Sequence, residues 1–104
     1  MDIKAAAEGL GLEEDEFSEI VELFLDTAKS DIDKLKEGFE SGDAEKAANA
    51  AHSLKGASGT LGFMEISEIA KKAEEDAKNN DIDKLGESVK KLNAFFEQLV
   101  SKFR

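Results

Sequence analysis

The sequence contains no cysteine, no proline, no tryptophan and no tyrosine. Without cysteine, disulfide bonds and thiolate metal sites are excluded, and a reducing compartment is allowed. Without proline, no helix is forced to break internally. A chain of 104 residues has the length of one domain and can bury one hydrophobic core. We therefore expect a single domain over residues 1–104, built without covalent cross-links.

Long apolar runs and an excess of basic residues are also lacking. No stretch approaches the roughly 18 to 20 apolar residues of a membrane span, and the first residues, Met1 to Lys4, lack the pattern of a secretion signal. The formal net charge is −10, so nucleic-acid phosphates and anionic membranes would be repelled. We expect a cytoplasmic protein that binds neither nucleic acid nor membranes. The start at Met1 and the end at Arg104 favour a stand-alone protein.

Apolar residues recur every three or four positions, which predicts helices. We expect a short helix over residues 2–8 and a long one over about 13–41. A third would run from about 44 to 61, a fourth would end at Asn79-Asn80, and a fifth would follow from 82 to 103. Asp43 would be the N-cap of the third helix and Asp81 that of the fifth. No alternation typical of strands is present.

These stripes predict an all-α fold: an antiparallel up-down four-helix bundle with a short extra N-terminal helix. Short connections place consecutive helices antiparallel. Each helix has one apolar stripe, and one bundle buries all of them, so we expect a monomer.

Most catalytic sites can be excluded. One histidine and no cysteine cannot form a zinc site, and no glycine-rich nucleotide-binding loop is present. The acidic stretches 13–16 and 81–83 lack the spacing of a calcium loop and fit helix N-termini instead. The inward Glu and His residues of a di-metal bundle are missing, as is the Asp-Ser-Leu serine of an acyl carrier protein. We therefore expect no metal and no cofactor on this chain.

His52, the only histidine, lies on the third expected helix and faces away from its apolar side, by roughly 135° at 100° per residue. Its helical neighbours are the small residues Ala48, Gly56 and Gly59, with Lys55 one turn away. An interior helix glycine costs about 1 kcal/mol relative to alanine. These small residues around His52, called the clearing below, are explained if the backbone of a partner protein must approach the imidazole. An ordinary surface histidine beside a helix end is the alternative.

The stretch from Ala51 to Gly62, AHSLKGASGTLG, resembles the motif of the histidine phosphotransfer (HPt) family. In that motif Ala-His and an apolar residue are followed by Lys-Gly, small residues, and then an apolar residue and Gly. The chain also has the length and helix order of the family, so the resemblance covers about residues 10–104. It implies that His52 is the phosphoacceptor, that Lys55 lies near the phosphoryl group and that Gly56 lets a receiver domain dock.

The resemblance also implies a role for Glu74, because the next helix of the family often carries a Gln or Glu that is hydrogen-bonded to the active imidazole. Geometry agrees. In an antiparallel hairpin centred near Gly62, His52 lies level with residues 71–74. A salt bridge of Glu74 with Lys71 or Lys78 is the alternative.

We therefore hypothesise that the protein carries a phosphoryl group on His52 between receiver domains of a two-component phosphorelay, without kinase or nucleotide-binding activity of its own. Nε2 would attack while Nδ1–H is donated to Glu74. The receiver domain of a response regulator or hybrid kinase would supply the aspartyl phosphate and Mg²⁺. It would dock around His52, and Leu10, Leu12 and Phe63 are further apolar candidates for its binding.

Two alternatives stay open. The same motif resembles the phosphoacceptor domain of chemotaxis-type histidine kinases, which also have Glu at the position of Glu74. Those domains often have a second histidine where this chain has Lys71, and a kinase domain would have to lie elsewhere. The other alternative is a non-catalytic helical adaptor in which His52 is incidental.

Overall fold

The computed structural model describes residues 3–103 and is all-helical over that range. Its elements are α1 (Ile3–Gly9), α2 (Glu14–Ser41), α3 (Ala44–Thr60), α4 (Met64–Lys78) and α5 (Ile82–Phe103). The predicted helices are thus confirmed to within about two residues at their ends. The expected start of the first helix at Asp2 lies outside the described residues.

Local chemistry explains where the helices begin and end. Gly42 closes α2 in the left-handed conformation, with φ of 73°, which glycine adopts without steric cost. Asp43 then caps α3 by accepting a hydrogen bond of 3.0 Å from the backbone N–H of Lys46. Asp81 accepts one of 3.2 Å from the backbone N–H of Lys84 at the start of α5. Both caps expected from the sequence are therefore present.

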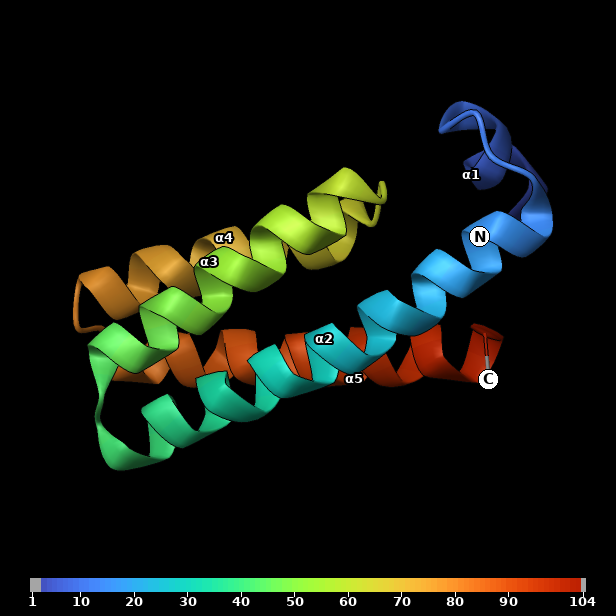
Figure 1. The fold of residues 1–104 in the computed structure, drawn as a ribbon. Coiled ribbons are helices and arrows are strands. Elements are labelled where there is room, and N and C mark those ends of the chain that lie inside the picture. The colour runs from blue at the N-terminus through green and yellow to red at the C-terminus, as the bar shows by residue number, and fades with distance from the viewer. Residues whose placement is uncertain (1–2, 104) are drawn as a thin grey trace.

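The four long helices form an antiparallel bundle (Figure 1). Around the bundle, α2 packs against α3, α3 against α4, α4 against α5, and α5 against α2. The molecule is elongated, with principal extents of 42 × 21 × 17 Å. The short α1 packs against α2 and lies at the end of the bundle where α2 begins and α5 ends (Figure 1). None of the helices within residues 3–103 combines the length and the apolar character that crossing a membrane requires.

The core changes character along the bundle. Leucines fill the space between the four helices, and α3 and α4 also bury several alanines, whose small side chains allow these helices to approach their neighbours closely. The fully buried side chains there include Leu25, Leu35, Leu54, Leu85, Leu92, Ala47, Ala51, Ala70 and Ala73. Burying this apolar surface is the main stabilising contribution to the fold.

Phenylalanines fill the end of the bundle near the α3–α4 turn. The Phe63 ring lies 5.1 Å from that of Phe24 and 6.4 Å from that of Phe103, between centroids. Phe63 is only 5% exposed, so its prediction as a docking residue was wrong. Although it follows the turn, it inserts between α2 and α5, because burying an aromatic ring is more favourable than leaving it in solvent. Leu12 is half-buried and packs on the core, whereas Leu10 is 43% exposed.

Replacing two helical glycines, Gly38 and Gly56, by alanine should change the stability of the fold in opposite directions. A Cβ on Gly38 would lie 2.8 Å from the Ala47 nitrogen and 2.9 Å from the Asp43 oxygen, both backbone atoms, whereas one on Gly56 would meet nothing within 4 Å. We expect Gly38→Ala to lower the free energy of unfolding by about 1–2 kcal/mol, since overpacking outweighs the gain in helix propensity. Gly56→Ala should raise it by about 0.5–1 kcal/mol. Urea titrations of both variants test this, and stabilisation by Gly38→Ala would contradict the close α2–α3 contact.

Candidate functional site

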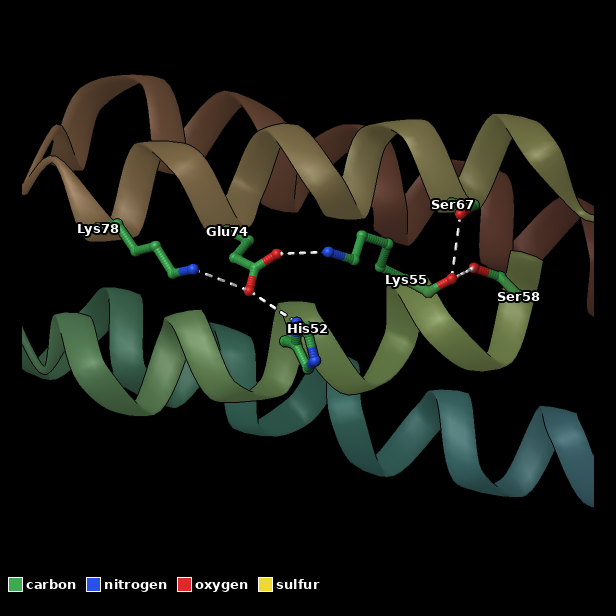
Figure 2. Close-up of polar contacts among 6 residues, drawn as sticks. All are labelled: His52, Lys55, Ser58, Ser67, Glu74 and Lys78. Carbon is green, nitrogen blue, oxygen red and sulfur yellow. Dashed lines mark hydrogen bonds and ion pairs between the residues drawn. The ribbon is translucent and has the colours of Figure 1, made fainter. Parts of the chain in front are cut away.

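His52 projects from α3 toward solvent, and one of its ring nitrogens is held by α4 (Figure 2). Nδ1 lies 2.8 Å from Oε2 of Glu74, and the imidazole side chain is 67% exposed. Because Nε2 lies on the opposite side of the ring, it faces away from the carboxylate (Figure 2). The contact expected between the two residues is therefore present, and it leaves Nε2 accessible.

Glu74 is the centre of the polar network between α3 and α4. Its side chain is only 8% exposed, although it carries a carboxylate. Oε1 accepts a hydrogen bond of 2.9 Å from Nζ of Lys55, and Oε2 lies 3.3 Å from Nζ of Lys78, in addition to its contact with His52. A buried carboxylate is costly unless it is paired, and here two ammonium groups and an imidazole surround it.

These partners fix the charge state of Glu74. The hydrogen bond from Lys55, supported by those from Lys78 and His52, lowers the pKa of the carboxyl group to about 2, and burial opposes this shift. The group is therefore a carboxylate at neutral pH and can only accept hydrogen bonds. For this reason the bonded nitrogen of a neutral His52 must be the one that carries the proton, which leaves Nε2 with its lone pair.

The hydroxyl group of Ser67 joins α4 to α3 one turn beyond the site. The backbone carbonyl of Lys55 accepts a hydrogen bond of 3.0 Å from Oγ of Ser67 on α4 and one of 3.3 Å from Oγ of Ser58 (Figure 2). A Cβ on Gly59 would lie 3.2 Å from the same Ser67 oxygen. The small residue at 59 thus lets Ser67 reach α3, and this contact holds Lys55 in register with Glu74.

The residues predicted to form a clearing around His52 differ in their surroundings. Gly56 is exposed, with open space around it, as expected. Ala48 is only 9% exposed and belongs to the core, so its assignment to an exposed docking surface was wrong. It lies on the flank of α3 that faces α4, and the close approach of these helices covers it. Gly59 is half-buried beside Ser67, which gives this glycine a reason within the fold.

Sequence reasoning offered His52 and Lys78 as alternative partners of Glu74, but the structure brings both to the same oxygen. The spacing of four residues between Glu74 and Lys78 was the available signal. Lys71, the other alternative, forms no ion pair with Glu74 in the described part of the chain.

The hydrogen bond of 2.8 Å from Oγ of Ser53 to the buried Asp31 of α2 was not predicted from the sequence. Within residues 3–103, no cluster of three or more His, Asp or Glu side chains could hold a metal ion.

Comparisons with known proteins bear on this arrangement. A sequence model of the Hpt domain matches residues 19–102. The fold is similar to the crystal structure of histidine-containing phosphotransfer protein B (HptB) from Pseudomonas aeruginosa PAO1, with a TM-score of 0.86 and 22% identity, over 99% of this chain and 90% of that chain. No curated protein sequence matches the chain.

The structural match defines the class of fold, an all-helical bundle like that of HptB. The Hpt model covers most of the sequence, and the chain therefore belongs to the Hpt domain family. Hpt proteins are phosphocarriers of phosphorelays and not kinases, and the chain has this phosphocarrier role. The resemblance identified from the motif around His52 is thus confirmed.

The low pKa of Glu74 predicts a pH-dependent effect of Glu74→Gln on stability. The folded-state pKa of about 2 lies below the ordinary 4.5, so the charged group stabilises the fold above pH 4.5, and this contribution is lost as the pH falls toward 2. At pH 7 we expect the free energy of unfolding of the variant to be about 1–3 kcal/mol lower than that of wild type. This deficit should shrink as the pH falls below 4.5, the ordinary pKa.

Denaturant unfolding of both proteins at several pH values measures this deficit. Glu75→Gln is the matched control, because Glu75 is the next residue on α4 and is exposed. Its effect should stay within about 0.5 kcal/mol at every pH. A Glu74→Gln deficit that does not change between pH 7 and pH 3 would contradict a buried carboxylate held by cations.

Proposed function

We propose that His52 accepts a phosphoryl group on Nε2 from the aspartyl phosphate of a receiver domain and passes it to a second receiver domain. The observation that carries this proposal is an exposed imidazole whose Nδ1 is bonded to a buried carboxylate at 2.8 Å. This arrangement orients the ring, directs Nε2 to solvent and leaves the rest of the ring open to a partner protein. Such positioning is the main requirement for phosphoryl transfer.

In the proposed step, Nε2 forms a bond to phosphorus as the bond from phosphorus to the receiver aspartate oxygen breaks. The electron pair of the broken bond stays on the aspartate, which leaves as a carboxylate. The imidazole gains positive charge, its proton stays on Nδ1, and Glu74 stabilises this charge at 2.8 Å. The reverse sequence delivers the group to the second receiver. Mg²⁺ belongs to the receiver in this scheme, and the chain needs neither a nucleotide nor kinase chemistry of its own.

Lys55 would neutralise phosphoryl charge on the carrier side. Its side chain is one third exposed, and its ammonium lies on the other oxygen of the carboxylate that holds His52. Lys55 and His52 therefore converge on one group from positions three residues apart on α3. A modest rotation of the flexible side chain would bring the ammonium to a phosphoryl group on the ring.

The test of this function is phosphoryl uptake from receiver domains. We expect wild-type protein, incubated with phosphorylated receivers and Mg²⁺, to acquire an acid-labile and base-stable phosphate. His52→Gln should acquire none, and its helical circular dichroism should match wild type because the side chain is exposed. Label on the His52→Gln variant would contradict the assigned site. Label only from a chemotaxis-type kinase and ATP would support the kinase-substrate alternative, and no label from either donor would favour the adaptor.

Gly56 provides a second test, because the receiver is proposed to approach its open surface one turn after His52. Gly56→Ala should lower receiver-driven uptake, with a higher KM, although we expect the variant to be more stable than wild type. Uptake from phosphoramidate, a donor too small to need a docking surface, should not change. A variant that loses both reactions equally would indicate damage to the site itself. A variant that keeps both at the wild-type rate would exclude Gly56 from the interface.

A further inference from the structure

Lys78 is the member of the Glu74 network that the proposed transfer leaves without a task. It is the last residue of α4, and its side chain is 65% exposed. A cation at a helix C-terminus already interacts favourably with the helix dipole, so this position alone needs no further explanation. Its ammonium, however, lies 3.3 Å from Oε2 of Glu74, the oxygen that also holds Nδ1 of His52.

The two lysines contact different oxygens of the Glu74 carboxylate. Lys55 approaches Oε1 from α3, and Lys78 approaches Oε2 from α4 (Figure 2). Resting Glu74 thus has two cationic partners, although one would neutralise its charge. The excess matters once a phosphoryl group is present, because Lys55 cannot serve the carboxylate and the phosphoryl oxygens equally well. If Lys55 moved away and no second cation remained, a carboxylate that is only 8% exposed would keep His52 as its single partner.

We propose that Lys78 is a positioning residue that retains Glu74 on Nδ1 of His52 while Lys55 turns to the phosphoryl group. This inference rests on the proposed function of His52 and adds a residue to it. In the resting protein Lys78 is the second cation on the carboxylate. In the phosphorylated protein, once Lys55 has turned away, Lys78 is the ammonium that remains on the carboxylate beside the charged ring, and it keeps the carboxylate directed at Nδ1. Lys78 itself touches neither the phosphoryl group nor the reacting nitrogen in this scheme.

The experiment compares Lys78→Met with Lys71→Met, which removes the same charge from an exposed site on the same helix, outside the Glu74 network. The donor is phosphoramidate, so no partner protein is needed. Lys78→Met should lower the rate of phosphoryl uptake by roughly twofold to fivefold, the range of a partly exposed ion pair. Lys71→Met should react like wild type, and Lys78→Arg should restore most of the rate.

A second readout separates positioning from a general effect of charge. In phosphorylated wild type, nuclear magnetic resonance should detect an Nδ1 proton on His52 that exchanges slowly with water, because Glu74 accepts it. The exchange should be faster in phosphorylated Lys78→Met and unchanged in Lys71→Met. Equal rates and equal proton protection in the two methionine variants would overturn the role of Lys78 while leaving His52 as the carrier. A wild type that takes up no phosphoryl group would overturn the proposed function itself.

Discussion

The site depends on one buried carboxylate. Glu74 projects from α4 into the contact with α3, where it binds His52 and Lys55 at 2.8 and 2.9 Å. Each of these contacts crosses from one helix to the other, so the orientation of the imidazole is set by how α3 and α4 pack. The tight packing of alanines, and the hydrogen bond from Ser67 to the Lys55 carbonyl, are therefore part of the site although they never meet the ring.

The same carboxylate explains how a small bundle can hold a solvent-exposed histidine in one orientation. The imidazole is 67% exposed, and exposure alone would leave it free to rotate and to change tautomer. The Glu74 carboxylate, which accepts a hydrogen bond from Nδ1, restrains both the rotation of the ring and the change of tautomer, and it leaves Nε2 open to a partner. The positive charges of Lys55 and Lys78 make it possible to bury this acceptor, and they hold its pKa near 2.

Much of this was predictable from the sequence, because the relevant information is local. Helix ends follow from caps such as Asp43, and the outward direction of His52 follows from its angle to the apolar stripe. The position of Glu74 opposite His52 follows from the short turn at Gly62, whose φ is 81°. What could not be predicted depends on distances between helices. Ala48 is buried because α4 comes close, and Phe63 is buried because the bundle end has room for a ring. The helical period gives directions but not these separations, and it cannot reveal that His52 and Lys78 share one oxygen.

The tautomer of His52 in the resting protein tests the account most directly. Long-range ¹⁵N–¹H correlation spectra at a pH where the ring is neutral distinguish a protonated Nδ1 from a protonated Nε2. Glu74 accepts from Nδ1 in this structure, so the spectra should show the proton on Nδ1 and a bare Nε2, and Glu74→Gln should weaken this preference. A wild-type spectrum dominated by the proton on Nε2 would contradict the account, because the nitrogen proposed to attack phosphorus would then have no lone pair available.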